Sequence, residues 1–222
     1  MNRFNIKIIA RIIESKKIDI VGLILHGSRI LDIQNKESDI DILAVVESGS
    51  HEDIVEIING EKYHILFRNK DYLNNLSEDF SNVVLNRIFD YNTLSGRLMS
   101  GDVLWEKNKN EIKNIIARNI STLDKRVLDQ KLHFQMLSQL HDATTFNRYI
   151  NTICIQNAVD TLVCRLLIKN NIFFLNQKWF PYYIEQYFDE EVSKYYYNLR
   201  FSQVPDLREL KKLYEWVNNY EI

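Results

Sequence analysis

The sequence predicts an α+β protein, in which a small α/β unit with a mixed sheet precedes a bundle of helices. Two runs of apolar, β-branched residues, 18–25 and 40–46, have the composition of buried strands and lie within the first seventy residues. From residue 111 onward the apolar residues recur mostly with the helical period instead. The 222 residues are 45% apolar and 26% charged, which is typical of a globular protein with a real core.

The expected elements of the first unit follow one another closely along the chain. Ile6, Ile9 and Ile13 form one apolar stripe, which predicts a helix over 5–15. The strand over 18–25 comes next, and a glycine-serine pair separates it from the second strand over 40–46. The remaining expected elements are a short helix over 52–58, a turn at Asn59-Gly60 and a third strand over 62–67.

The second unit is expected to be helical. Pro181 and Pro205 lie near the expected starts of two helices, where the first turn tolerates proline. The change of pattern near residues 107–109 predicts two domains, residues 1–107 and residues 108–222. The expected helices cover about 112–140, 146–168, 181–199 and 205–220.

Bulk properties argue against several classes of function. The formal charge of −2 gives no global basic field, so a nucleic-acid partner is not expected. No run approaches 18 uninterrupted apolar residues, and the N-terminus is too polar for a secretory signal. Cys154 and Cys164 lie in one apolar stretch without a metal-binding spacing, which predicts structural thiols in a cytoplasmic protein. A homodimer is left open.

The candidate chemistry lies in two short stretches, Gly27-Ser28 and, after nine intervening residues, Ser38-Asp39-Ile40-Asp41. Side chains two apart on a strand point to the same face, so the two aspartates are expected to project together. Adjacent carboxylates repel each other and resist burial. Mg²⁺ removes this conflict because it prefers carboxylate and phosphate oxygens, and the pair is compatible with a two-ion arrangement.

The glycine-serine pair is suited to phosphate. Gly27 lets the backbone approach closely, and the freed N–H groups and the Ser28 hydroxyl can donate to phosphate oxygens. Arg29 and Lys36 lie close in sequence and can add positive charge. These groups would assemble an in-line attack of an acceptor hydroxyl on the α-phosphorus of an NTP, with pyrophosphate leaving.

The arrangement GS-x9-SDID, set across strand, loop and strand, resembles the signature of the polymerase-β-like nucleotidyltransferase superfamily. That superfamily includes aminoglycoside and lincosamide nucleotidyltransferases and small antitoxin-type members. The resemblance covers roughly the first 105 residues, and the helical remainder is more loosely similar to the bundle of the antibiotic-modifying members. It implies that Asp39 and Asp41 ligate Mg²⁺ and act in catalysis.

The resemblance also implies which residues bind the nucleotide. Gly27 and Ser28 would hold the triphosphate of ATP or another NTP, with Arg29 and Ser38 beside them. The segment Asn176-Gln177-Lys178-Trp179 is similar to a Lys-Trp element in the bundles of antibiotic-modifying members, which makes Lys178 a further candidate.

The acceptor implied by the resemblance is a hydroxyl on a small, antibiotic-like molecule, which would receive AMP. Some relatives place a catalytic base on the second helix of the bundle. Asp160 is the candidate for that base, and Asp142 is a second candidate.

The sequence departs from the superfamily's pattern at a third carboxylate, which the next strand normally supplies. Aligning the apolar positions places His64 there, and Glu61 is expected to face the opposite side. Three interpretations stay open. His64 can serve as a base or a weak ligand; a carboxylate can come from Glu61 by a register shift, or from the helical domain; or catalysis is lost and nucleotide binding is kept.

The alternatives in function follow from this departure. One is a catalytically degenerate nucleotide-binding or antitoxin-type regulatory protein. The other is transfer of AMP to a protein or a tRNA.

Overall fold

The computed structural model describes residues 3–15, 17–31, 38–49, 51–86, 91–143 and 147–220, with the backbone alone described for residues 3–5 and 7. Its contacts divide the chain into two compact units. We call residues 1–80 with 93–123 the sheet unit, and residues 81–92 with 124–222 the helical unit. The predicted boundary at residues 107–108 lies just before a helix over residues 111–122 that belongs to the sheet unit.

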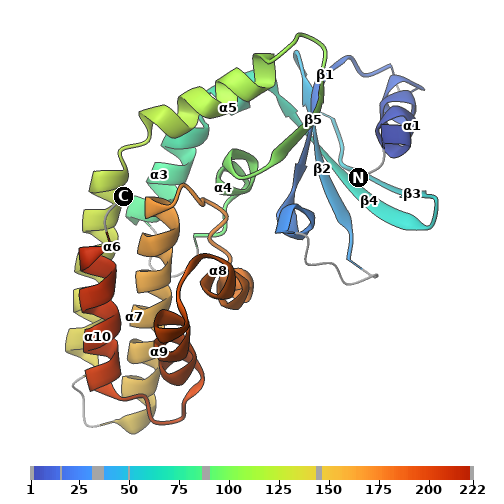
Figure 1. Cartoon of the computed structure of the whole chain (residues 1–222). Helices are drawn as coiled ribbons and strands as arrows, with labels where there is room; N and C mark the ends of the chain where they lie inside the picture. The colour runs from blue at the N-terminus through green and yellow to red at the C-terminus, as the bar shows by residue number, and fades with distance from the viewer. Residues whose placement is uncertain are drawn as a thin grey trace. The chain divides into compact units, whose positions relative to one another are not determined.

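The sheet unit is built on a mixed sheet of five strands. They are β1 (Ile20–His26), β2 (Ile40–Val46), β3 (Ile54–Ile58), β4 (Glu61–Asn69) and β5 (Asp102–Glu106). Their order is β3-β4-β2-β1-β5 (Figure 1). β2 runs parallel to β4, and the other neighbours are antiparallel. The predicted α+β class, with a small mixed sheet ahead of a helical region, is confirmed.

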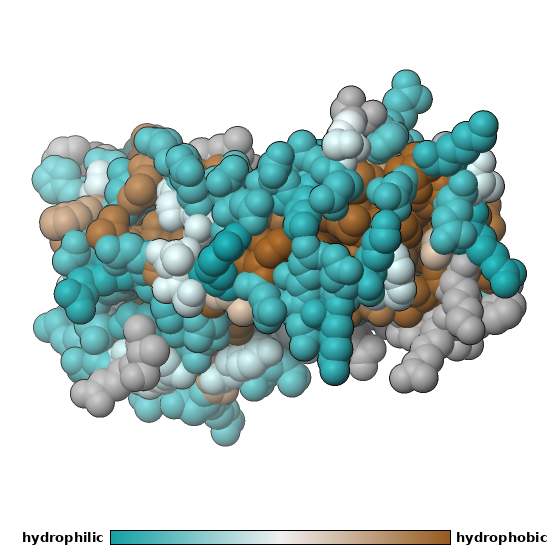
Figure 2. Space-filling view, turned by 90° about the horizontal axis from the view of Figure 1, so that it is seen from above, coloured by the Kyte–Doolittle hydropathy of each residue, from teal (hydrophilic) through white to brown (hydrophobic). Residues whose placement is uncertain are grey.

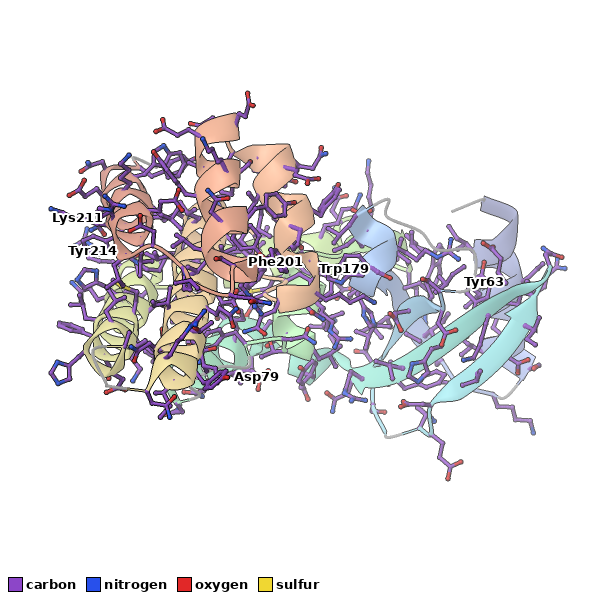
Figure 3. All side chains as sticks on the ribbon, turned by 90° about the horizontal axis from the view of Figure 1, so that it is seen from below. Tyr63, Asp79, Trp179, Phe201, Lys211 and Tyr214 are labelled. Atoms are coloured by element: carbon purple, nitrogen blue, oxygen red, sulfur yellow. The ribbon has the colours of Figure 1, made fainter. Side chains whose placement is uncertain are left out.

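One face of the sheet packs against α1 (Arg3–Ser15). Alternate residues of the strands point to this face, because successive side chains of a strand point to opposite sides. Ile42 and Tyr63, the latter labelled in Figure 3, are fully buried there with Ile9 and Ile13 of the helix. The apolar stripe that predicts this helix is therefore the side that it buries.

Helices also pack on strands β4, β1 and β5. The helices α2 (Lys70–Asn74), α4 (Leu94–Met99) and α5 (Glu111–Thr122) contact β4, β1 and β5 respectively. The buried Asn119 of α5 joins two of these helices, since its amide donates to the Leu73 carbonyl at 2.8 Å. These contacts hold α2 and α5 together beside the sheet.

The helix predicted over 52–58 is wrong, because this segment forms β3. Its β-branched residues lose side-chain freedom in a helix and pack well on a pleated surface. Asn59 and Gly60 both have positive φ, +54° and +81°, as a two-residue hairpin turn requires. The predicted turn is thus confirmed, and it folds 54–58 back onto β4.

The described part of the helical unit is built mainly of the helices α6 to α10 (Figure 1). They are α6 (Lys125–Asp142), α7 (Arg148–Lys169), α8 (Phe180–Tyr187), α9 (Glu190–Phe201) and α10 (Leu207–Asn219). The chain also passes from the sheet unit into the helical unit within α3 (Leu76–Asn86). Pro181 lies in the first turn of α8, as predicted.

Two of the predicted helices are each divided by a capping aspartate. The segment 112–140 breaks before α6, where the Asp124 carboxylate accepts a hydrogen bond from the Val127 N–H at 3.1 Å. The segment 181–199 breaks in the same way before α9, where the Asp189 carboxylate accepts from the Val192 N–H at 2.9 Å. A capping aspartate satisfies an N–H group that a new helix would leave without a partner, so it starts a helix.

Hydrophilic side chains cover most of the face seen in Figure 2, and hydrophobic ones show between them. Some large apolar side chains are exposed all the same, including Ile57 on β3 and Phe134 on α6. Among the described residues, none of the helices combines the length and the apolar character needed to span a lipid bilayer.

Candidate active site

Gly27 ends β1 in a backbone conformation that favours glycine. Its φ is +73°, and the chain continues in a short 3-10 helix, η1 (Gly27–Leu31). His26 pairs with Asp41 in the β1–β2 ladder, which brings the aspartate beside the turn. A Cβ atom at position 27 would lie only 2.3 Å from Asp41 Oδ2. The glycine-serine turn and the second aspartate therefore form one corner of the sheet, which we call the GS corner.

Asp41 lies on the face of the sheet away from α1, because Ile40 and Ile42 on either side of it face that helix. Asp39 lies just before β2, and its carboxylate is 2.8 Å from Lys62 Nζ on β4. The Asp39 and Asp41 side chains are 38% and 26% exposed. Both carboxylates are thus partly open to solvent at the GS corner.

The electrostatics of the GS corner are unfavourable to a second negative charge. The pKa of Asp41 is raised, chiefly because the carboxyl is partly buried, and the charge of Asp39 adds to this rise. The charges of Arg97 and His64 act in the opposite sense. A carboxylate that resists ionisation beside another carboxylate is stabilised when a divalent cation binds between them.

Arg29 holds together the two loops that contain Ser28 and Ser38. Its guanidinium donates to the Ser38 carbonyl at 3.1 Å and lies 3.6 Å from the Glu61 carboxylate. The Arg29 side chain is 12% exposed, so it contacts protein more than solvent. Nucleotide binding by these serines and by Arg29 stays a prediction. Lys36, the other predicted source of charge, lies outside the described residues.

His64 stands in β4 beside Asp41, at the place where the aligned strands predict a third acid. The two residues are partners in the parallel ladder, and His64 Nδ1 lies 3.7 Å from Asp41 Oδ1. The register shift that would bring Glu61 to this position does not occur. Glu61 instead accepts a hydrogen bond at 3.2 Å from the hydroxyl of Tyr63.

Asp53 is a residue of this corner that the sequence interpretation missed. Its Oδ2 lies 4.0 Å from Nε2 of His64, so the imidazole ring stands between two carboxylates. Asp53 was missed because a helix was predicted over 52–58. Folding the chain back at Asn59-Gly60 as a hairpin would have placed this acid near His64.

Arg97 is another residue near the GS corner that the sequence interpretation missed. Arg97 is on α4, and its charge acts on both Asp41 and His26. His26 is 1% exposed, and neither ring nitrogen has a hydrogen-bond partner among the described residues. Burial, followed by the charges of Arg97 and His64, lowers the pKa of His26 to about 3. The ring next to the GS corner is therefore neutral, and no local sequence pattern indicates the arginine.

Comparison with known proteins agrees with this geometry. Residues 6–92 match the family model described as a nucleotidyltransferase domain. Residues 6–92 form a nucleotidyltransferase domain. The match includes β1 to β4 and hence the whole GS corner. It supports nucleotidyl transfer as the general reaction and a transferase as the class of protein.

A solved structure of a nucleotidyltransferase-like protein from Exiguobacterium sibiricum also overlaps with the chain. The overlap covers 90% of this chain and 69% of that one, with 12% sequence identity and a TM-score of 0.47. No curated protein sequence matches the chain. The assignment of the nucleotidyltransferase domain rests on the family model.

The donors of the nucleotidyltransferase domain suit a cation that arrives with its substrate. In the part of the chain that the structure describes, no three His, Cys, Asp or Glu side chains converge as a ready metal site. Mg²⁺ is usually held by one or two carboxylates together with substrate phosphates. Asp39 and Asp41 fit that pattern, because they are two partly exposed carboxylates beside a turn that can bind phosphate.

The two remaining predicted site residues belong to the helical unit. Asp160 of α7 is 6% exposed and accepts a hydrogen bond from Arg200 Nε at 2.8 Å. Burial raises its pKa to about 6, although Arg200 acts in the opposite sense. Lys178 lies in η2 (Gln177–Trp179), with its Nζ 4.7 Å from the centre of the Trp179 ring. The catalytic role of Asp160 and the nucleotide-binding role of Lys178 stay predictions.

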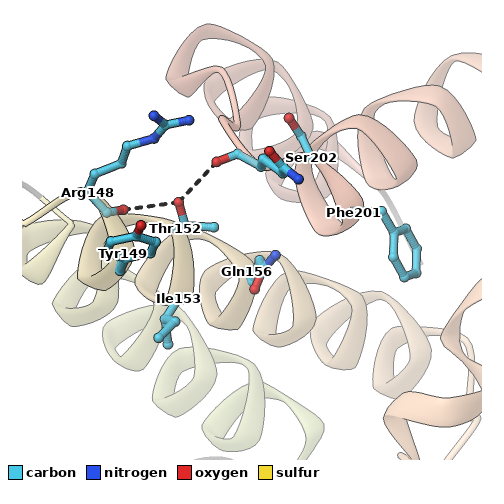
Figure 4. Close-up of a pocket in the computed structure, with 8 residues that line it drawn as sticks. Arg148, Tyr149, Thr152, Ile153, Gln156, Phe201 and Ser202 are labelled. Carbon is cyan, nitrogen blue, oxygen red and sulfur yellow. Dashed lines mark hydrogen bonds between the residues drawn. The ribbon is translucent and has the colours of Figure 1, made fainter.

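The helical unit also has a cavity of about 600 Å³ between the start of α7 and the end of α9 (Figure 4). The Thr152 hydroxyl donates to the carbonyls of Arg148 and Gln203, at 3.1 and 3.4 Å. Tyr149 and Phe201 line the cavity and are largely exposed. None of its lining residues is an acid, so it offers neither a carboxylate ligand nor a carboxylate base.

Proposed function

We propose that the protein transfers a nucleoside monophosphate, AMP in the first instance, from an NTP to a hydroxyl of a small acceptor, with Mg²⁺ or a similar ion as cofactor. The observation that carries this proposal is the position of the Asp41 carboxylate against Gly27 of the glycine-serine turn. A carboxylate that can bind a cation and a turn that can bind phosphate, placed side by side, suit a metal-bound phosphate ligand such as an NTP with its cation.

Each residue of the GS corner would have a separate role in binding the NTP and the cation. The N–H groups after Gly27 and the Ser28 hydroxyl would orient the phosphates, because they lie at the open end of β1. Asp39 and Asp41 would hold the cation, which supplies neutralisation of the charge on the phosphates. Arg29 would keep Ser38 and the turn in place through its bond to the Ser38 carbonyl. The result is in-line attack on the α-phosphorus, achieved by positioning and charge neutralisation.

The acceptor is the part of the proposal that rests on family resemblance. A small, hydroxylated, antibiotic-like molecule is proposed because the helical remainder of the chain resembles the bundle of antibiotic-modifying nucleotidyltransferases. Transfer of AMP to a protein or a tRNA is the alternative for the same GS corner.

The test measures pyrophosphate release by the full chain with each of the four NTPs. Aminoglycosides, lincosamides, tRNA and protein are supplied in turn as acceptors. We expect release with at least one acceptor and its loss in Asp39→Asn and in Asp41→Asn. Asp102→Asn is the matched control, because this aspartate lies on β5 of the same sheet and is exposed. Unchanged turnover in both variants of the pair would refute the proposal.

A second candidate function is favoured by one observation, the presence of His64 where a third carboxylate is expected. In this case the domain binds a nucleotide and regulates a partner without transferring anything. Calorimetry with a non-hydrolysable NTP separates the two functions. Tight binding that depends on Asp41, together with no pyrophosphate release for any acceptor, would support the regulatory function over the transferase.

A further inference from the structure

His64 and Asp53 are held together by one hairpin. β3 and β4 pair from Ile54↔Ile65 to Ile58↔Glu61, and Val55 lies directly opposite His64. Asp53 lies directly before β3, two residues before Val55. Its side chain therefore reaches the same side of the sheet as the His64 ring.

The two ring nitrogens of His64 face different carboxylates. Nδ1 is 3.7 Å from Asp41 Oδ1, and Nε2 is 4.0 Å from Asp53 Oδ2. A neutral imidazole has one proton, so it can donate toward only one of the two carboxylates. When a cation binds at Asp41, the nitrogen that faces it must be the unprotonated one, and the proton then lies on Nε2, toward Asp53.

We propose that His64, oriented by Asp53, replaces the third carboxylate of the site as a nitrogen ligand, and that it makes the site select Mn²⁺ over Mg²⁺. The inference rests on the proposed function and deepens it by naming the cation. His64 Nδ1 is the ligand atom, and Asp53 is a positioning residue that holds the proton on Nε2. Metal-binding histidines commonly donate their second N–H to a carboxylate in this way.

The spacing of the donor atoms is compatible with a shared ion. Ligand atoms lie about 2.1 Å from a small divalent ion, so two of them can be up to about 4.2 Å apart. The 3.7 Å between Nδ1 of His64 and Oδ1 of Asp41 is within that limit. The Asp53 side chain is 46% exposed, so it is free to rotate from 4.0 Å to hydrogen-bond distance of Nε2.

The selectivity follows from the type of donor atom. Mg²⁺ is a hard ion that binds oxygen and gains little from an imidazole. Affinity for sites that contain nitrogen increases along the first transition series, beginning with Mn²⁺. Replacing an oxygen ligand by His64 therefore weakens Mg²⁺ more than Mn²⁺.

The first experiment measures the binding of both ions to the full chain in the presence of a non-hydrolysable NTP. Mn²⁺ is followed by electron paramagnetic resonance, and Mg²⁺ by its displacement of Mn²⁺. We expect His64→Asp, which restores the oxygen ligand, to lower the ratio of Mg²⁺ to Mn²⁺ dissociation constants about tenfold. Asp53→Asn should weaken Mn²⁺ binding about tenfold, as the loss of an orienting partner typically does.

The control for Asp53→Asn is Glu52→Gln, which removes the neighbouring exposed negative charge. This change keeps both carboxylates that face His64. Glu52→Gln should leave the ratio of the two dissociation constants unchanged. Asp53→Glu, which keeps the carboxylate, should restore most of the Mn²⁺ affinity. A general effect of surface charge would instead appear equally in the Asp53 and Glu52 variants.

The second experiment reads the tautomer of His64 directly from its ¹⁵N chemical shifts, at a pH where the ring is neutral. We expect the proton on Nε2 in the natural protein, and a mixture of tautomers in Asp53→Asn. This readout does not depend on turnover, and it is made with Mg²⁺ and the non-hydrolysable NTP present. A proton on Nδ1 in the cation-bound protein would overturn the inference.

The outcomes separate this inference from the proposed function. Cation binding that is lost in Asp41→Asn but has the same ion ratio in His64→Asp overturns the selectivity and leaves the transferase intact. No Mn²⁺ or Mg²⁺ binding in the natural protein, even with the NTP present, overturns the cation site of the proposed function itself.

Discussion

Asp41 in the sheet unit and Asp160 in the helical unit both have a carboxyl group whose pKa is raised by burial, but their charged neighbours differ. Asp160 has the Arg200 guanidinium at 2.8 Å. Asp41 has another acid, Asp39, nearby, and Arg97 offsets only part of the rise in its pKa.

The neighbours of each acid distinguish a structural acid from a candidate ligand. A buried carboxylate with its own arginine has its charge partly compensated within the chain, so the ion pair alone accounts for its place in the fold. Two partly exposed carboxylates near each other are further stabilised when a cation binds, and ionisable groups with such shifted pKa values are typical of functional sites.

The largest expected effect is on the rate of nucleotidyl transfer. Asp41→Asn should lower pyrophosphate release by at least about a thousandfold, which corresponds to about 4 kcal/mol of lost transition-state stabilisation. Asp160→Asn should lower it less than about tenfold, because its carboxylate is already bound to Arg200. Steady-state kinetics of both variants measure this contrast. A thousandfold loss in Asp160→Asn would erase it and make Asp160 the catalytic base.

The next largest expected effect is on the pH dependence of the unfolding free energy. The pKa of Asp160 is raised from 3.8 to about 6, so the folded state binds more protons than the unfolded state between these values. The contribution of Asp160 to stability therefore falls as pH rises from about 4 to about 6, by up to about 3 kcal/mol. Urea unfolding at several pH values measures it. The decrease should be absent in Asp160→Asn, and an equal decrease there would assign it to another group.

A pair of glycine substitutions tests whether Asp41 depends on the turn beside it. Gly27 and Gly60 both have positive φ, but a Cβ meets a neighbour only at Gly27. Each change to alanine should cost about 1–2 kcal/mol of unfolding free energy. NTP-dependent cation binding should be lost in Gly27→Ala alone. Similar binding in both variants would mean that contact between the turn and the carboxylate is unimportant.

The smallest expected effect is that of replacing Lys62, whose ammonium group forms an ion pair with the Asp39 carboxylate. Because the pair is exposed, Lys62→Met should change the unfolding free energy by less than about 0.5 kcal/mol. Lys62→Met should strengthen cation binding severalfold, since the Asp39 carboxylate then no longer pairs with the Lys62 ammonium group. Titration with Mn²⁺ measures this change, and weaker binding would instead indicate that Lys62 contacts the phosphates.

Strands β1, β2 and β4 and the place of Asp41 beside the glycine-serine turn were predictable because their signals are local. The apolar run 40–46 coincides with β2, and aligning apolar positions placed His64 beside Asp41 correctly. Asp39 and Asp41 follow from the two-residue repeat of a strand. Each of these predictions needs only neighbouring residues and the spacing between them.

The parts that were not predicted depend on partners distant in sequence. Asp53 required the hairpin that was mistaken for a helix, and Arg97 required the packing of α4 near Asp41. The breaks at Asp124 and Asp189 were missed because the apolar period continues across them, while a single capping side chain decides where the helix starts. The partner of Asp160 lies forty residues away, on α9, and no spacing rule indicates it.

The β3–β4 hairpin and the turn after β1 contribute different parts of the proposed site. The turn that would receive the triphosphate is on β1, whereas Asp53 and His64 are both on this one short hairpin. Changes confined to the hairpin can therefore alter the preferred ion and leave the β1 turn as it is. On this inference, the choice of ion and the binding of the phosphates are encoded in separate segments of the sequence.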